Sequence, residues 1–360
     1  MSIVDLGIPL AVRSELAVRG VRTETSVRRG PGAGPSDDGH LVVDGVNAAL
    51  PIDPGSPYVV RDGRILDLGA GAADLGVAVT PVRRPRFYDL ATADGVAYQK
   101  IALLHGRDVL ASTVVQTCVR YAESQRCRFC AIEESLYAGS TVAAKTPAQL
   151  AEVAAAAVEL DGVRQVVLTT GTTTGPDRGA IHLARCVRAI TAAVPGIPVQ
   201  VQIEPPGDLD LIDELHRAGA TAIGIHAEAL DDEVRRAWMP GKGSVPMAEY
   251  EAAWDRAVAV FGRNHVSTYV LIGLGEDTDE LVAACGRLVE RGVYPFVVPL
   301  RVLPGTLAHR DGATAPDPAV VADVTRRVAD RLRAAGMRGA DQGAGCAACG
   351  ACSALPAAGA

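Results

Sequence analysis

The sequence lacks three features that would define a function class by themselves: an excess of positive charge, a long apolar run and an export signal. The chain has 360 residues and a formal net charge of -7, which argues against a protein that holds nucleic acid through bulk electrostatics. No stretch approaches the roughly 18 consecutive apolar residues of a membrane span. We therefore expect partners that are neither nucleic acids nor membranes.

The first thirty residues do not have the pattern of a signal peptide. They contain Asp5, Arg13, Glu15 and Arg19 and no unbroken apolar segment. We therefore expect a cytoplasmic location, where clustered cysteines more often bind metal or act as catalytic thiols than form disulfides. The P-loop, the zinc-protease motif and the G-x-S-x-G turn are also missing, and "GLGEDT" lacks the last glycine of G-x-G-x-x-G.

Six short β-branched runs alternate with helical patterns from about residue 109 onward. One helix is expected to begin with Thr146 as N-cap and Pro147 in its first turn, and another carries an apolar face from Leu281 to Val289. Such alternation predicts right-handed βαβ units, a partial barrel of α/β class, and a site at the carboxyl ends of the strands. The expected strands cover residues 109–115, 164–170, 198–204, 221–228, 265–273 and 294–301.

Two other regions flank the barrel that we expect over residues 105–336. Residues 1–104 contain Asp-Gly turns within 40–52 and 58–69, which predict hairpins of a small α+β extension, and residues 30–39 are expected to form a loop. Residues 337–360 form a tail that is rich in Gly and Ala but contains three cysteines.

Three cysteines lie close together directly after the first expected barrel strand. Eight residues separate Cys118 from Cys127, and two separate Cys127 from Cys130. Structural zinc thiolates usually come as two pairs, whereas an iron–sulfur core tolerates irregular ligand spacing. Three thiolates on a four-iron core would leave one iron free to hold a small molecule. The position after the strand places such a core at the mouth of the barrel.

This segment, "CVRYAESQRCRFC", resembles the cluster motif of the radical S-adenosylmethionine (SAM) superfamily. "CRFC" keeps the usual two-residue gap and the aromatic residue before the last cysteine, Phe129, whereas the first gap is eight residues instead of three. The resemblance covers roughly residues 105–310. It implies a partial (βα)6 barrel of TIM type, a [4Fe–4S] cluster on Cys118, Cys127 and Cys130, and bound SAM. It also implies an electron donor such as a flavodoxin or ferredoxin, and a small-molecule substrate.

The same resemblance implies which residues contact SAM. "VVLTTGTTTGPDRGAIH" is similar to the second-strand segment of lipoyl synthases, "GIHAEALDDEVRRAWMPG" to the fourth-strand segment of the biotin synthase and lipoyl synthase branch, and "YVLIGLGEDTDE" and "VVPLRVLPGT" to the fifth and sixth. The reductive cleavage of SAM would yield a 5'-deoxyadenosyl radical that abstracts hydrogen from substrate. The expected SAM contacts are Phe129, Thr169, Thr170, Gly171, Glu204, His226, Glu228, Arg235, Arg236, Gly273, Leu274, Gly275, Glu276 and Arg301.

The tail cysteines have no packing explanation in the sequence. Cys346, Cys349 and Cys352 are spaced by two residues each, and we expect them to be ligands of an auxiliary iron–sulfur cluster. Zinc binding, or a redox-active or disordered tail, are the alternatives. Lipoyl synthases build their second cluster on an N-terminal cysteine group, and no cysteine precedes Cys118, so we do not expect lipoyl synthase itself. Cys186 and Cys285 are expected to be core residues, since each shares a helical face with apolar residues.

The whole pattern, including "RRGPGAGPSDDG" at 28–39 and the tail cysteines, most resembles a radical SAM family of bacterial nitrilase-associated gene clusters. This resemblance suggests a small nitrogen-containing substrate, processed to or from a nitrile. The alternatives are a sulfur-inserting synthase with an auxiliary cluster, an iron–sulfur electron carrier or redox sensor, and a zinc-stabilised aldolase-like barrel.

Overall fold

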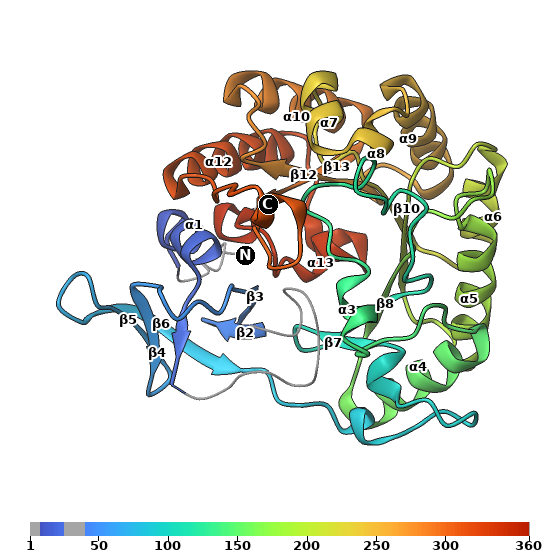
Figure 1. Cartoon of the computed structure of the whole chain (residues 1–360), viewed down its shortest axis with the longest axis horizontal. Coiled ribbons are helices and arrows are strands. Elements are labelled where there is room, and N and C mark those ends of the chain that lie inside the picture. The colour runs from blue at the N-terminus through green and yellow to red at the C-terminus, as the bar shows by residue number, and fades with distance from the viewer. Residues whose placement is uncertain (1–7, 25–39, 360) are drawn as a thin grey trace.

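The computed structural model describes residues 8–24 and 40–359. The loop expected over 30–39, and with it the whole "RRGPGAGPSDDG" segment at 28–39, lies outside the described residues. A curled parallel sheet with helices on its outer face forms most of the molecule (Figure 1).

The curled sheet has seven strands in the order β13-β12-β11-β10-β9-β8-β7. Neighbours from β8 to β13 are parallel, and β7 is antiparallel to β8. The six expected barrel strands and the partial (βα)6 barrel are therefore confirmed. The strands are β7 (Leu103–His105), β8 (Val109–Thr113), β9 (Gln165–Thr169), β10 (Val199–Ile203), β11 (Ala222–Ile225), β12 (Val266–Ile272) and β13 (Val293–Pro299).

These runs form strands because both of their faces are covered. Every residue of β10, β11 and β13 is buried, as expected for parallel strands between helices and a filled interior. Polar residues in β10 alternate with apolar ones, since Gln200 and Gln202 lie two apart and Glu204 follows at the strand end. The three side chains therefore belong to the same face of the sheet.

Helices cover the convex face of the sheet (Figure 1). The expected cap is confirmed, because Thr146 Oγ1 accepts a hydrogen bond from the backbone N–H of Gln149. In return, Gln149 Oε1 accepts one from the backbone N–H of Thr146. No helix in the described ranges is long and apolar enough to cross a membrane. The helices of this region are α3 (Glu134–Tyr137), α4 (Pro147–Asp161), α5 (Ala180–Ala193), α6 (Asp210–Arg217), α7 (Asp232–Trp238), α8 (Pro240–Gly243), α9 (Met247–Phe261), α10 (Thr278–Arg291), α11 (Leu307–Arg310) and α12 (Pro318–Ala334).

The N-terminal extension adds a second sheet, with the order β1-β4-β5-β6-β2-β3. Both expected hairpins are confirmed, with Asp44-Gly45 and Asp62-Gly63 as their turns. All four turn residues have positive φ, as a two-residue type I′ turn requires. The elements are α1 (Leu10–Arg19), β1 (Arg22–Thr23), β2 (His40–Val43), β3 (Val46–Ala49), β4 (Tyr58–Arg61), β5 (Arg64–Asp67), β6 (Ala73–Pro81), η1 (Arg86–Asp89) and η2 (Tyr98–Lys100).

The C-terminal tail packs inside the curled sheet. It forms η3 (Gly339–Gln342), α13 (Cys346–Cys349) and η4 (Leu355–Ala358), and α13 lies on the concave side of the barrel strands (Figure 1). The backbone N–H of Gly345 donates to Gln165 Oε1 at 2.8 Å, and Leu355 is completely buried. The Gly- and Ala-rich composition therefore serves close packing within the barrel.

The extension and the tail also hold each other. The backbone N–H of Ala49, in β3, donates to the carbonyl of Ala351 at 2.9 Å. Arg13, which is buried in α1, donates to the same carbonyl at 2.7 Å. The extension thus covers the open side of the barrel and fixes the segment that carries the tail cysteines.

We predict that replacing Gly345 with alanine loosens the tail. A Cβ at this position would lie 2.2 Å from Gln200 Cδ, and φ is +108°. Gly343→Ala is the matched control, because Gly343 also has positive φ but nothing lies within 4 Å of its Cβ position. Urea unfolding should show Gly345→Ala as the less stable variant by about 1–3 kcal/mol. Equal losses in the two variants would contradict the tight packing of the tail.

Candidate functional site

The loop after β8 carries the first cysteine triad and is held by backbone hydrogen bonds to three other parts of the chain. Val119 N–H donates to Thr172 O at 2.9 Å, Arg128 N–H donates to Trp238 O at 2.8 Å, and Ala308 N–H donates to Arg128 O at 2.8 Å. The loop is therefore fixed against the end of β9, helix α7 and helix α11. Such anchoring preorganises the three thiols without a regular secondary structure.

Gly171 allows this loop to approach the end of β9. A Cβ on Gly171 would lie 2.0 Å from the carbonyl oxygen of Thr117, much closer than any side chain tolerates. The glycine that the sequence singled out as a SAM contact therefore has a local structural reason as well. It places Cys118 beside the carboxyl end of β9.

The three thiols line one cavity of about 200 Å³. Burial raises the pKa of the Cys130 thiol to about 11 and that of Cys127 well above its usual value, and the neighbouring sulfurs add to both shifts. The Cys127 and Cys130 thiols thus resist ionisation unless a cation compensates their charge. An iron–sulfur core supplies such compensation, since it binds cysteines as thiolates.

Much of the expected SAM site lies around this same cavity. Ten expected residues converge from the cluster loop and from the ends of β9, β10 and β11. They are Cys118, Cys127, Phe129, Cys130, Thr169, Thr170, Gly171, Glu204, His226 and Glu228.

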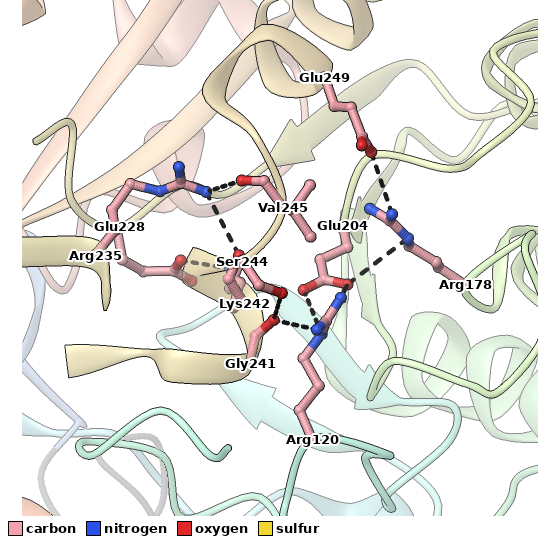
Figure 2. Close-up of polar contacts among 10 residues, drawn as sticks. All are labelled: Arg120, Arg178, Glu204, Glu228, Arg235, Gly241, Lys242, Ser244, Val245 and Glu249. Carbon is pink, nitrogen blue, oxygen red and sulfur yellow. Dashed lines mark hydrogen bonds and ion pairs between the residues drawn. The ribbon is translucent and has the colours of Figure 1, made fainter. Parts of the chain in front are cut away.

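Two buried carboxylates in the cavity have cationic partners that the sequence had not indicated. Lys242 forms an ion pair with Glu228, and Arg120 forms one with Glu204 at 3.0 Å (Figure 2). Burial is the largest single effect on Lys242 and works against its ammonium, but Glu228, Tyr250, Cys127 and Glu204 together outweigh it and raise the pKa of Lys242. The lysine therefore stays charged at neutral pH.

Arg178 and the carbonyl of Gly241 extend this network. Arg178 lies 4.0 Å from Glu204 and bonds Glu249 at 3.2 Å, and Arg120 also donates to the Gly241 carbonyl (Figure 2). Lys242, Arg120 and both carboxylates line a single cavity, and Arg178 contacts Glu204 from outside that lining. A ligand with both an ammonium and a carboxylate group, such as an amino acid moiety, finds complementary charges there.

His226 presents an unpaired donor to the cavity. Its Nδ1 accepts the backbone N–H of Tyr269 at 3.1 Å, and burial, with Lys242 nearby, lowers its pKa to about 3. The neutral ring therefore carries its proton on Nε2, which is buried and has no hydrogen-bond partner among the described residues. An orphaned donor on the wall of a cavity indicates a missing acceptor, and the hydroxyl or carboxylate oxygens of SAM would supply one.

The expected residues on α7 are placed elsewhere by the fold. Arg235 is fully buried beneath the Tyr250 ring and donates to Val245 O at 2.9 Å, so it fastens α7 to the segment before α9. Arg236, its neighbour, is exposed. Neither lines the thiol cavity, because the helical turn carries both side chains away from the strand end.

The segment after β12, which was expected to contact SAM, also lies outside the lining of the thiol cavity. The carbonyl of Leu274 accepts from Trp238 Nε1 at 2.6 Å, and Glu276 Oε1 accepts from Leu230 N–H at 3.0 Å. Burial raises the pKa of Glu276 to about 7. Gly273 and Gly275 have positive φ and form the turn that leads into α10. The segment therefore holds residues 228–231 in place through hydrogen bonds and does not line the cavity itself.

Arg301 was expected beside SAM but lies next to the tail. It donates to the carbonyl of Ala49, and its surroundings include Cys352 and Tyr269. Burial lowers the pKa of Arg301, and that of Arg13 to about 10, while Cys352 opposes both shifts. Each guanidinium has one buried nitrogen without a partner in the described part of the chain. Anionic thiolates on the tail would balance these two charges.

The tail cysteines line a second cavity, of about 310 Å³. Cys346 Sγ accepts from Gln202 Nε2 at 3.1 Å, and burial raises the pKa of Cys346 to about 11 and that of Cys349 to about 12. Thr169 and Gln202 line both cavities. Thr169 and Gln202 therefore form part of the wall of each cavity, one lined by each cysteine triad.

Sequence reasoning missed several residues of this interior. Lys242 lies in the single-turn helix α8 and Arg120 in an irregular loop, and neither segment has a spacing that signals the direction of the side chain. Gln202 had a usable signal, since "VQVQIE" alternates polar residues within a strand that is otherwise Val and Ile. The core assignment of Cys186 and Cys285 is confirmed, because both are completely buried.

Comparisons with known proteins agree with this geometry. Residues 123–288 match the family model described as the Radical SAM superfamily. Lipoyl synthase of Methanocella arvoryzae is 29% identical over 185 residues, which cover 49% of this chain and 56% of that protein. Lipoyl synthase of Halorhodospira halophila is 26% identical over 272 residues, which cover 68% of this chain and 76% of that protein. The match thus spans about half the length of the first relative.

The similarity to the radical SAM superfamily covers residues 123–288, and it supports a [4Fe–4S] cluster and SAM as cofactors. The similarity to lipoyl synthases supports the expected biotin synthase and lipoyl synthase-like branch. Among solved structures, methylornithine synthase is 14% identical with a TM-score of 0.49, covering 70% of this chain and 72% of that one. The FeFe-hydrogenase maturase HydG of Carboxydothermus hydrogenoformans is 17% identical with a TM-score of 0.45, and the match covers 63% of this chain and 51% of that one.

We predict that Lys242→Met destabilises the protein by about 3 kcal/mol, because it leaves the buried Glu228 carboxylate unpaired. Burial already raises the pKa of Glu228, so in the variant this group binds a proton more tightly when folded than when unfolded. The loss of stability should therefore be smaller near about pH 5 than near about pH 8 in urea unfolding. Adding Glu228→Gln should recover most of the loss at the higher pH, and simple additivity of the two losses would contradict the pairing.

Proposed function

We propose that Cys118, Cys127 and Cys130 hold the SAM-binding [4Fe–4S] cluster, and that the substrate is a small molecule bound in the second cavity. The observation that carries this proposal is the shared lining of the two cavities by Thr169 and Gln202. A substrate in the second cavity would reach SAM in the thiol cavity at these two residues. When bound, the cluster supplies the electron that cleaves SAM to methionine and a hydrogen-abstracting 5'-deoxyadenosyl radical.

The protein's own residues would bind and orient SAM. Three thiolates leave one position of a four-iron core for its amino acid group. Lys242 and Arg120 are the cations nearest to the buried carboxylates and would bind the carboxylate of that group, while Glu204 or Glu228 would accept a hydrogen bond from its amino group. His226 Nε2 would donate to a hydroxyl or carboxylate oxygen. We also propose that a flavodoxin or ferredoxin delivers the electron.

The interior position of the second cavity supports a hydrogen-abstracting enzyme. Its walls come from the barrel strands, the segment after β8, the N-terminal extension and the tail, so that a bound substrate would be surrounded by several parts of the chain. We retain a small nitrogen-containing substrate as the finer proposal, since the overall sequence pattern resembles the family of nitrilase-associated gene clusters. Hydrogen abstraction next to nitrogen would then begin its conversion.

Sulfur insertion is a second candidate, which the position of the tail cysteines favours. Cys346, Cys349 and Cys352 line the cavity proposed for substrate instead of the outer surface, and Arg13 and Arg301 offset negative charge beside them. Two of the similar proteins are lipoyl synthases. An auxiliary cluster on the tail would then lie where it can donate sulfur to a substrate radical.

The proposal predicts that SAM cleavage depends on the first triad alone. After anaerobic reconstitution with iron and sulfide, dithionite and SAM should yield 5'-deoxyadenosine, measured by chromatography, and Cys118→Ala/Cys127→Ala/Cys130→Ala should abolish it. The matched control is Cys186→Ala/Cys285→Ala, which removes two buried thiols outside both triads and should keep the reaction. Cleavage by the triple variant, or a wild type that holds only zinc, would overturn the assignment.

The tail triad is tested in the same preparation. Cys346→Ala/Cys349→Ala/Cys352→Ala should still form 5'-deoxyadenosine, while its iron content falls from about eight to about four per chain if the tail holds a four-iron cluster. Unchanged iron content would contradict a cluster on the tail.

A further inference from the structure

A buried lysine lines the second cavity and has no role in the chemistry described above. Lys145 is 2% exposed, and its Nζ donates to Gln116 Oε1 at 2.9 Å. No carboxylate of the described residues forms an ion pair with it, and burial alone lowers its pKa to about 7. Its position is fixed, since its backbone N–H donates to Val114 O at 2.9 Å and the preceding Ala144 bridges to Val115.

A purely structural role explains Lys145 poorly. Removing an ammonium from water is costly unless a carboxylate compensates it, and an apolar side chain of similar length would be more stable there. Gln116 takes only one of the three donors that an ammonium offers. Two donors therefore remain for a ligand in the cavity.

The use of lysine in the chain as a whole points to the same interior. Only three of the 35 Lys and Arg residues are lysine. Lys100 and Lys145 line the second cavity, and Lys242 lines the thiol cavity. All three lysines of the chain therefore lie on cavity walls, where their compact ammonium groups differ from the planar guanidinium of arginine.

The remaining lining of the second cavity is suited to an anion. It contains no Asp or Glu, whereas Lys100, Lys145 and two stacked histidines, His40 and His105, contribute to it. The other polar groups near Lys145 are neutral, such as those of Ser135 and Thr141. A cavity of about 310 Å³ suits a small molecule, and the excess of basic groups selects one with negative charge.

We propose that Lys145 anchors the carboxylate group of a small organic acid, which is the substrate class of the second cavity. The acid would extend from Lys145 towards Thr169 and Gln202, where the thiol cavity begins, so that its chain carbons face the SAM side. This assignment rests on the proposed function for the location of the substrate, and it adds the chemical group by which the substrate is held.

Binding to the cluster-reconstituted protein tests the proposal. Acetate, propionate, butyrate, pentanoate and hexanoate are titrated by calorimetry, each beside its neutral amide. At least one acid should bind about 10-fold or more tightly than its amide, a difference of about 1.4 kcal/mol, and Lys145→Met should remove that preference. Acids that fail to bind, that bind no better than their amides, or that bind Lys145→Met as they bind the wild type would each overturn the proposal.

The ligand-free variant supplies a second readout. A binding lysine destabilises the empty protein, so Lys145→Met should unfold at a higher temperature than the wild type, whereas a structural lysine would give a lower midpoint. 5'-Deoxyadenosine formation by the wild type is measured separately. Failure of that reaction alone counts against the proposed function, and failure of acid binding alone counts against the anchor.

Discussion

The packing of the C-terminal tail against the inner face of β10 is the interaction on which the interior depends. A six-stranded partial barrel leaves an open side and an unfilled interior, and parallel strands do not tolerate either in water. Gly345 lies against the Gln200 side chain and bonds Gln165, so the tail occupies one end of the lumen. The rest of the lumen contains two cavities, and Thr169 and Gln202 line both of them.

Charge explains why these cavities stay polar inside an otherwise apolar barrel. Buried thiols with raised pKa values line both of them, and buried cations stand beside both triads: Lys242 near the first, and Arg13 and Arg301 near the second. An apolar filling would be more stable than such groups. The buried thiols and cations are consistent with bound clusters whose charge completes the charge balance of each cavity. These groups lower the folding stability of the barrel locally and provide binding sites.

The strand order, the two hairpins and the position of the first triad were predictable because each depends on local sequence. Near-continuous apolar runs predict buried parallel strands, Asp-Gly pairs predict type I′ turns, and a cysteine directly after a strand must lie at the carboxyl edge of the sheet. The residues that end β9 and β11, such as Thr169 and His226, reach the cavity for the same reason.

Other parts of the site depend on contacts between distant segments and could not be predicted. A strand end indicates the edge of the sheet but not what covers it, so Arg301 faces the tail, and Glu276 supports a neighbouring loop. Lys242 and Arg120 meet the buried carboxylates only because helix α8 and the loop after β8 fold over the same strands. The packing of the tail itself depends on small residues, whose composition alone resembles that of a linker.

The most direct test of the account asks which triad binds SAM. Electron–nuclear double resonance of the reduced protein, with SAM carrying nitrogen-15 in its amino group, measures whether that nitrogen is bound to cluster iron. The account predicts a nitrogen coupling in the wild type and in the variant without Cys346, Cys349 and Cys352, and none in the variant without Cys118, Cys127 and Cys130. A coupling that disappears with the tail cysteines and persists without the first triad would contradict it.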